Sequence, residues 1–404
     1  MTDTAAGGAL DGLFDGVLEL TRALVRIPSV HDPARGLNEQ PAADLVVATM
    51  RSWGWEPVVE LVASGRPNVH AVVDGGLPGP TLLFEGHTDV VTEGDLSAWT
   101  VDPFGGELRD GRLYGRGAAD MKGGLAAMLY AVRALQLAGP FPGRVKVACL
   151  VDEEGMMLGA KHFVAAGHAA DCDGAIVCEP AAEEVCPVAK GALRLRVDAH
   201  GAMAHGAMPH HGRNPNPALA RLTDWLAGYQ AELQRIHGEH PQLGWPYATV
   251  TVVRGGEPEQ LNVIPASAWL AVDVRTVPGM DHAGIVTDIA KAAAELAAVD
   301  QVSTEVTVVD DRPAADTPVS DPVVQAVIAA HREVTGAEPV IGGVPGATDG
   351  TILWRDAGLP VVVYGPGGKW IAHQADEYVE ADDLVRKARV YLAAARRFLT
   401  AGSG

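Results

Sequence analysis

The sequence has few cysteines and no long apolar run. Only four of its 404 residues are cysteine (Cys149, Cys172, Cys178 and Cys186), and no two of them form a Cys-X-X-Cys pair. Unpaired thiols are typical of a reducing compartment. No stretch reaches the roughly 18 consecutive apolar residues that a membrane-spanning helix needs. The stretch 1–16 lacks the continuous apolar segment of a signal peptide. We therefore expect a cytoplasmic protein without a membrane partner.

The sequence is also poor in positive charge. It has 31 Lys and Arg residues against 51 Asp and Glu residues, which gives a net charge of −20 at pH 7. This charge argues against nucleic acid as a partner. It does not exclude a small anionic substrate, because a bound metal cation can reverse the local field. With 48% hydrophobic residues and no internal repeat, the chain is typical of a globular protein, and its length predicts two domains.

Strand and helix patterns alternate in both terminal parts of the chain. Helical apolar spacing predicts helices at 10–25, 41–53, 125–137, 321–334 and 381–399. Short apolar runs predict strands at 58–62, 68–74, 81–85, 144–151, 174–178 and 360–364. The composition of residues 342–350 predicts a glycine-rich loop. This order predicts an α/β fold, in which ligands bind at the carboxyl ends of the strands.

The pattern changes between residues 190 and 310. Strands are predicted at 192–199, 247–253, 268–274 and 302–309, with helices at 215–236 and 281–297. The order β-α-β-β-α-β is that of the ferredoxin-like unit. We infer an inserted α+β domain at 190–310. The residues 1–189 and 311–404 then form the other domain.

An imidazole and a carboxylate follow the predicted strand at 81–85. His87 and Asp89 belong to the segment Leu-Leu-Phe-Glu-Gly-His-Thr-Asp-Val-Val. Alternate side chains of an extended backbone point the same way, so Asp89 can orient His87 as a metal ligand. The alternative is a strand end whose histidine is hydrogen-bonded and has no further role.

Other potential ligands lie at the ends of predicted strands or beside glycine-rich loops: Asp120, Glu153, Glu154, Glu179 and His373. Imidazoles and carboxylates are ligands of zinc, cobalt and manganese. Two ions with about three protein ligands each, one of them shared, could be held by such a set. The alternatives are that Asp120 caps the following helix and that Glu153 and Glu154 are solvated surface residues. On extended backbone Glu153 and Glu154 would point in opposite directions and could serve different roles.

Several short motifs occur in a fixed order along the chain. They are Gly-His-Thr-Asp-Val-Val at 86–91, Gly-Arg-Gly and Asp-Met-Lys-Gly-Gly within 115–124, Asp-Glu-Glu-Gly at 152–155, Glu179-Pro180, and His373. In this combination the chain resembles the di-metal amidohydrolase and exopeptidase family of acetylornithine deacetylase, succinyl-diaminopimelate desuccinylase, aminoacylase and glutamate carboxypeptidase. The resemblance covers nearly the whole chain. It implies a catalytic domain with a mixed sheet and helices on both faces. It also implies that the inserted domain is a lid through which two copies form a homodimer.

The resemblance further implies a metal-binding role for five residues. His87, Asp120 and Glu179 would hold one divalent ion. Asp120, Glu154 and His373 would hold a second, so that Asp120 bridges the two. Zinc is the expected metal, and cobalt or manganese suits the same ligands.

By the same resemblance, two residues would support the chemistry of the metal pair. Asp89 would orient the first imidazole. Glu153 would be the general base that takes a proton from the attacking water and passes it to the leaving amine.

The inserted domain matches further positions of the family. His205, in Gly-Ala-Met-Ala-His, resembles the lid histidine that stabilises the oxyanion, although Gly follows it where the family commonly has Ser. Asn262 and Arg275 match substrate-binding positions, and Arg suits a carboxylate. Gly346 and Thr348 lie in a segment that resembles the family's carboxylate-binding Gly-Thr-Ser-Asp loop. Three other histidines are alternatives to His205: His200, His210 and His211.

The Glu179-Pro180 pair is typical of the deacetylase and desuccinylase branch of the family. We therefore predict hydrolysis of the amide bond of an N-acyl amino acid or a related linear amide with a free carboxylate. One alternative is a carboxypeptidase or dipeptidase with the same mechanism. Others are a family member that binds amino acids or peptides without hydrolysing them, and a purely structural oligomer.

Overall fold

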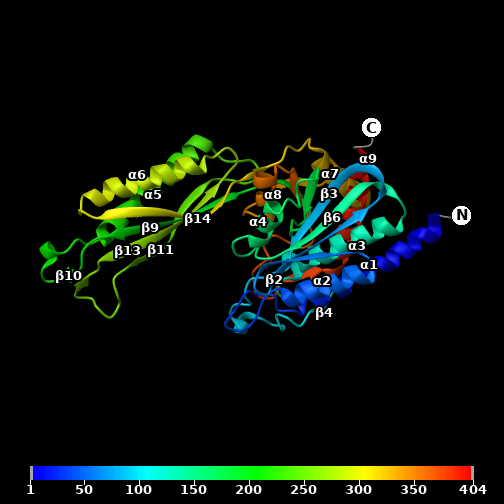
Figure 1. The fold of residues 1–404 in the computed structure, drawn as a ribbon, viewed down its shortest axis with the longest axis horizontal. Coiled ribbons are helices and arrows are strands. Elements are labelled where there is room, and N and C mark those ends of the chain that lie inside the picture. Colours follow the sequence, from blue (N-terminus) through cyan, green and yellow to red (C-terminus); the bar gives the residue numbers. More distant parts are fainter. Residues whose placement is uncertain (1–2, 402–404) are drawn as a thin grey trace. The chain divides into compact units, whose positions relative to one another are not determined.

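The computed structural model describes residues 3–401, with side chains described from residue 12 onward. The chain divides into two compact units, of which the first contains Met1–Val188, Thr317–Gly343 and Thr348–Gly404. The second contains Ala189–Asp316 and Val344–Ala347 (Figure 1). The stretch 1–16, expected not to be a signal peptide, lies partly outside the described residues. Between residues 3 and 401, no helix combines the length and apolarity needed to cross a bilayer.

A mixed sheet forms the centre of the first unit. Apart from the two-residue strand β15 (Ala315–Asp316), its strands are β1 (Val58–Ala63), β2 (Arg66–Asp74), β3 (Gly76–His87), β6 (Phe141–Leu150), β7 (Gly174–Val177), β8 (Glu184–Ala189), β16 (Val340–Val344) and β17 (Val361–Val363). They follow the order β1-β2-β6-β3-β7-β17-β8, with β16 beside β8. β3 is parallel to β6 and β7, and β7 is parallel to β17. The pairs β1–β2, β2–β6 and β17–β8 are antiparallel. The predicted α/β class with a mixed sheet is thus confirmed.

Helices cover both faces of this sheet. The larger core includes residues of α1 (Asp3–Val25), α2 (Gln40–Ser52), α3 (Gly123–Leu137), α7 (Pro322–Thr335) and α9 (Ala381–Ala401). On this face Phe84 of β3 contacts Tyr391 of α9, with ring centroids 5.4 Å apart. Because side chains alternate along a strand, Glu85 points to the other face, where it meets Asp349 of α8 (Asp349–Ala357). That face also carries α4 (Leu158–Ala165), whose Phe163 contacts the imidazole of His70.

The second unit is a four-stranded antiparallel sheet with two helices. Its elements are β9 (Gly191–His200), α5 (Asn216–His237), β11 (Tyr247–Gly255), β13 (Ser267–Thr276), α6 (His282–Ala298) and β14 (Ser303–Arg312). The strand order β11-β13-β9-β14 places the first and third strands of the chain at the centre, as in the ferredoxin-like unit. Leu195 and Val197 of β9 share an apolar core with Leu222 of α5 and Ile289 of α6. The predicted β-α-β-β-α-β order is confirmed.

Several short elements lie outside the predicted set. They are α4, α8, β8, β16, the pair β10 (Ala204–His205) and β12 (Val263–Ile264), and the small sheet of β4 (Glu107–Arg109), β5 (Arg112–Tyr114) and β18 (Tyr378–Glu380). The predicted loop at 342–350 is too long: the stretch contains the end of β16 and the start of α8, and only 345–348 is a loop. Glycine disfavours strands in general, but at Gly342 the side chain of Glu184 on β8 fills the space that a Cβ would need.

Candidate active site

The predicted ligands converge at one edge of the mixed sheet. His87 is the last residue of β3, which extends two residues further at its carboxyl end than predicted and also begins five residues earlier. Glu153 and Glu154 follow β6, and Glu179 follows β7. β6, β3 and β7 are adjacent and parallel, so their carboxyl ends lie side by side. This is the edge at which an open α/β sheet binds its ligands.

Asp120 lies between two imidazoles. Its Oδ1 is 3.2 Å from Nε2 of His87, and its Oδ2 is 3.3 Å from Nε2 of His373. Nε2 of His87 is also 3.3 Å from Oε1 of Glu179. Nε2 of His373 is 2.8 Å from Oε1 of Glu154. Each imidazole therefore faces one carboxylate of its own and one oxygen of Asp120.

The backbone before α3 delivers Asp120 to this position. Asp120 has φ −117° and ψ 95°, and the helix begins at Gly123 with Lys122 as its N-cap residue. The alternative that Asp120 caps α3 is therefore wrong. A Cβ at Gly124 would collide with the carbonyl oxygen of Cys178, the residue before Glu179. A glycine at 124 thus lets the start of α3 approach the end of β7.

Asp89 connects the first imidazole to the acidic segment after β6. Its Oδ1 lies 3.5 Å from Nδ1 of His87 and accepts the backbone N–H of Glu153 at 3.2 Å. Its Oδ2 accepts the backbone N–H of Glu154 at 3.1 Å. The extended backbone expected here is wrong, because Asp152 adopts φ +67° and a turn follows it. The turn allows both amides to point at one carboxylate.

The carboxyl groups of the site are buried and crowded. Burial and the neighbouring Glu179 raise the pKa of Glu153 well above its usual range. Burial and Asp120 raise the pKa of Glu179 to about 8. Burial also acts to raise the pKa of Asp120, but hydrogen bonds with His373 and His87 lower it.

This crowding fits a site for divalent cations. Donor atoms of two sets lie within 4.8 Å of one another: His87, Asp120 and Glu154, and His87, Glu153 and Glu179. Packing several buried carboxylates together is costly unless a cation compensates their charge. Two imidazoles with shared and unshared carboxylates are the donors that zinc, cobalt and manganese accept. The residues thus suit a pair of metal ions.

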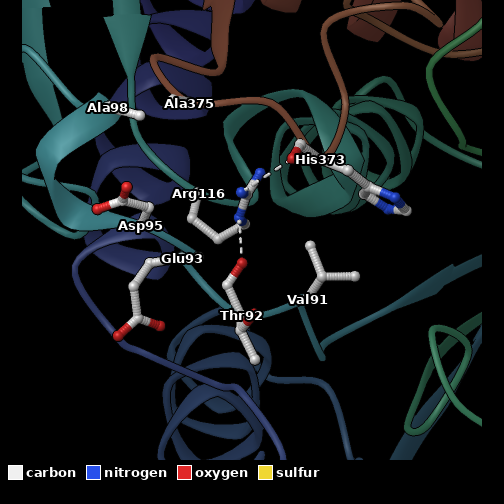
Figure 2. A pocket seen from close by; sticks show the side chains of 9 residues that line it. Val91, Thr92, Glu93, Asp95, Ala98, Arg116, His373 and Ala375 are labelled. Carbon is white, nitrogen blue, oxygen red and sulfur yellow. Dashed lines mark hydrogen bonds between the residues drawn. The ribbon is translucent and has the colours of Figure 1, made fainter.

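A pocket of about 390 Å³ opens beside His373 (Figure 2). The segment 91–95 forms one wall, and Arg116 and Ala375 contribute to the others. The guanidinium of Arg116 donates to the carbonyl oxygens of Thr92 and His373, each at 3.2 Å. The side chain of His373 is 51% exposed, so this end of the site is open to solvent.

Two buried residues to which the sequence motifs assign no role hold the site together. Nη1 of Arg116 lies 2.5 Å from Oε2 of Glu377. Oε1 of Glu377 accepts the backbone N–H groups of Ala119 and Asp120 at 3.0 and 3.1 Å. Because Arg116 also binds the carbonyl oxygen of His373, the pair connects the loops of two predicted ligands. Arg116 lies within the Gly-Arg-Gly motif, whereas Glu377, four residues after His373, lies in none of the motifs, so no local signal marked the pair.

We expect Glu377→Gln to weaken both the fold and metal binding. The substitution leaves the buried guanidinium of Arg116 without its counter-charge, which costs about 3 kcal/mol of stability. It also loosens the backbone at Asp120, so metal affinity should fall about 10- to 100-fold. Thermal unfolding and competition with a chelator measure the two effects. Glu380→Gln, which breaks an exposed pair with Arg112, is the control and should change neither quantity appreciably. Equal thermal stability and equal metal affinity in the two variants would contradict the role assigned to the Arg116–Glu377 pair.

Two of the predicted lid residues are neighbours in the second unit. β10 and β12 pair His205 with Val263, and the N–H of Gly206 donates to the carbonyl oxygen of Asn262 at 2.6 Å. Both His205 and Asn262 are exposed. Nδ1 of His205 accepts the N–H of Ala207 at 3.1 Å. In a neutral ring this assigns the proton to Nε2, which then can donate a hydrogen bond.

The other predicted substrate residues are divided between the two units. Nε of Arg275, on β13, is 2.7 Å from Oδ1 of Asp273, so its guanidinium already has one carboxylate partner. Gly346 belongs to the second unit, and a Cβ there would meet no atom within 4 Å. Thr348 belongs to the first unit, where it is the buried N-cap residue of α8. Its hydroxyl makes no hydrogen bond with the described residues.

Comparison with known proteins identifies the family. A model of the peptidase family M20/M25/M40 matches residues 83–397, which is more than half of the chain. The chain belongs to this family. The resemblance expected from the motifs is thereby confirmed. As a family member, the protein is an enzyme, a metal-dependent hydrolase of linear amides, and its buried donors suit a dinuclear metal site.

Curated relatives match the chain over almost its full length. The succinyl-diaminopimelate desuccinylase of Rhodospirillum centenum is 34% identical over 395 residues, covering 93% of this chain and 95% of that protein. The protein of the same name from Methylobacterium nodulans is 33% identical over 384 residues, covering 93% and 94%.

Solved structures share the fold at lower identity. The M20 family metallo-carboxypeptidase from Sulfolobus solfataricus has a TM-score of 0.77 at 21% identity, covering 95% of this chain and 99% of that chain. Human carnosine dipeptidase 1 has a TM-score of 0.74 at 17% identity and covers 98% of each chain. At these identities the likeness establishes the M20 fold alone.

Proposed function

We propose that this M20 enzyme hydrolyses the amide bond of an N-acyl amino acid, with an N-succinyl group as the first candidate for the acyl part. The observation that carries the proposal is the position of Asp120, whose two oxygens face the imidazoles of His87 and His373 at 3.2 and 3.3 Å. This is the arrangement expected of a carboxylate that bridges two metal ions. The choice of a succinyl group is supported by the desuccinylases that match 93% of the chain.

In this proposal five residues hold two divalent ions. His87, Asp120 and Glu179 bind one ion, and Asp120, Glu154 and His373 bind the other. We propose zinc, with cobalt or manganese able to replace it, because imidazole and carboxylate ligands suit all three. The bound ions supply Lewis-acid stabilisation of the amide carbonyl and lower the pKa of the attacking water.

In the proposed reaction Glu153 transfers a proton and Asp89 orients the imidazole of His87. Glu153 takes one proton from the attacking water and gives it to the amine nitrogen as the C–N bond breaks. Burial raises the pKa of Glu153, which suits a group that must accept and then donate a proton near neutral pH. The carboxylate and the backbone carbonyl oxygen of Asp89 both face Nδ1 of His87. They hold the N–H at Nδ1, so that Nε2 is left free for the ion.

The remaining predicted residues would act on the substrate in this proposal. His205 donates from Nε2 to the oxyanion that forms on the substrate carbonyl, and Asn262, Arg275, Gly346 and Thr348 bind the substrate carboxylate. A homodimer formed through the second unit is part of the proposal. It is supported by exposed apolar side chains on the edge strand β11, such as Val253, which is 59% exposed. A cytoplasmic location is supported by the four unpaired cysteines.

We expect His205→Ala to lower kcat about 10²- to 10³-fold, the usual loss when one oxyanion donor is removed. Metal content should not change, since His205 is not among the proposed ligands. Steady-state kinetics and metal analysis check the two quantities. His211→Ala is the matched control. An unchanged kcat for His205→Ala with a large loss for His211→Ala would transfer the role to His211.

A substrate panel tests the proposed function. Chelator-stripped protein should cleave no N-succinyl amino acid, N-acetyl amino acid or dipeptide. Added zinc, cobalt or manganese should restore cleavage, fastest for the N-succinyl substrates. Metal-restored cleavage of dipeptides in preference to acyl amino acids would favour the peptidase alternative. Full metal binding with no cleavage of any class would refute the proposed function.

A further inference from the structure

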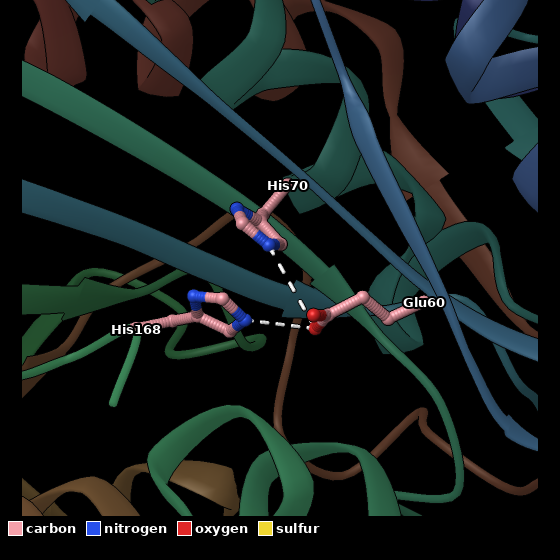
Figure 3. Close-up of side chains that lie close together, drawn as sticks. All are labelled: Glu60, His70 and His168. Atoms are coloured by element: carbon pink, nitrogen blue, oxygen red, sulfur yellow. Dashed lines mark hydrogen bonds and ion pairs between the residues drawn. The ribbon is translucent and has the colours of Figure 1, made fainter. Parts of the chain in front are cut away.

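A second group of metal-binding side chains lies away from the catalytic residues. Glu60 of β1, His70 of β2, His162 of α4 and His168, which follows α4, form what we call the outer histidine cluster. Figure 3 shows the rings of His70 and His168 next to each other, both facing the carboxylate of Glu60. None of the four belongs to the proposed catalytic machinery. The cluster occupies the face of the sheet that α4 covers, at its β1–β2 edge.

His70 is the unexplained member of this cluster. Its side chain is only 7% exposed, yet neither ring nitrogen has a hydrogen-bond partner among the described residues. Leaving a buried polar group unsatisfied costs about 1–3 kcal/mol, so such a group calls for a partner. Burial lowers the pKa of His70 to about 4, which keeps the ring neutral with a free lone pair. A neutral imidazole is the form that binds a metal.

The distances around Glu60 fit one small cation. Oε2 of Glu60 lies 2.8 Å from Nε2 of His168, 3.6 Å from Nε2 of His162 and 3.9 Å from Nε2 of His70. In a tetrahedral zinc site with ligand bonds of about 2.1 Å, adjacent donor atoms lie about 3.4 Å apart. One donor atom each of Glu60, His70 and His168 already lie within 4.8 Å of one another.

The surroundings hold the rings in place and moderate the nearby charge. Phe163 is fully buried and contacts the rings of His70 and His168, with centroids 5.5 and 5.4 Å away. Lys146, whose charge acts on His70, donates to the carbonyl oxygen of His168 and binds Asp171 at 2.7 Å. The ammonium is therefore directed at oxygen acceptors of its own, and Asp171 offsets its charge.

We propose that the outer histidine cluster binds a divalent transition metal ion, with zinc as the probe, through Glu60, His70, His162 and His168. Three imidazoles and one carboxylate would complete a closed tetrahedral shell, as in a structural site. The ion would tie the edge strand β1 to α4, the helix that follows the acidic turn of the active site. Its role is structural, and it adds one ion to those of the catalytic site.

Metal counting on the full-length protein tests this site independently of catalysis. Chelator-stripped wild type and the double variant His70→Gln/His168→Gln are incubated with zinc alone, desalted and analysed for zinc per chain. The wild type should retain one ion more than the double variant, whatever number the catalytic site holds. The control His237→Gln/His240→Gln, which changes two histidines of the second unit, should retain as many ions as the wild type.

A milder variant covers the case in which the double variant fails to fold. His162 is 40% exposed, so His162→Gln should fold normally and lower the affinity for the additional zinc ion at least about 10-fold in chelator competition. Its hydrolytic activity should equal that of the wild type. Unchanged zinc affinity in His162→Gln would overturn the proposal, and so would equal zinc content in wild type and a folded double variant. The cluster would then be only a hydrogen bond between His168 and Glu60.

Discussion

Replacing Glu153 by glutamine is expected to lower kcat by about 10³-fold or more while both metal ions stay bound. The amide cannot take a proton from water or return one to the leaving nitrogen, and general acid–base groups contribute up to about 10⁴-fold. The substitution keeps the size of the side chain and the backbone N–H that donates to Asp89. Steady-state kinetics, metal analysis and a pH profile of kcat/KM measure the result.

The neighbouring residue provides the contrast for this experiment. Glu154 lies in the same turn, but its carboxylate contacts His373, so Glu154→Gln should lower metal content as well as activity. A donor atom of Glu153 also lies within 4.8 Å of His87 and Glu179. If Glu153→Gln lost a metal ion, Glu153 would be a ligand and not the base. Retained kcat would exclude it from the mechanism altogether.

Asp120→Asn is the second change with a large expected effect. The amide keeps one oxygen and replaces the other by an NH₂ group, which cannot bind a cation. Because the two oxygens face different imidazoles, one of the two ions loses a ligand and the other loses a negative charge. Metal content should fall below two ions per chain. A loss of about 4 kcal/mol of transition-state stabilisation would lower kcat/KM about 10³-fold.

Asp110→Asn is the control for this change. Asp110 is exposed and has φ +52°, a conformation that asparagine tolerates well. It should have the metal content and activity of the wild type. Two tightly bound ions in Asp120→Asn would contradict the bridging role. Excess zinc or cobalt should restore at most part of the lost activity, since the bridging charge is still absent.

Local sequence patterns were sufficient to predict a helix or strand where the segment itself contains a clear apolar pattern. The helix predicted at 381–399 and the strand at 68–74 match α9 and β2 closely, because an apolar stripe or a short apolar run suffices to specify each. Short elements such as α4 and α8 were not predictable in this way. Eight or nine residues carry too little periodicity, and packing on the sheet stabilises them.

Buried polar residues likewise divide into those that a local motif identifies and those that only long-range contacts identify. Asp120 and Glu179 were recognisable from the motifs that contain them, whereas Glu377 had no such signal. The importance of Glu377 lies in contacts with Arg116, Ala119 and Asp120, which are more than 250 residues away in the sequence. The proximity of Glu60 to His70 and His168 likewise depends on β1, β2 and α4 coming together.

The sequence by itself therefore determined the fold class, the family and the candidate ligands, because hydrophobic periodicity and short motifs are written in neighbouring residues. Only the tertiary structure decided that Asp120 faces two imidazoles, that Asp89 binds the acidic turn, and that His205 and Asn262 are neighbours. These contacts join residues on different strands and loops. The path of the backbone between them, including the turn at Asp152 and the close approach at Gly124, sets which donor atoms meet.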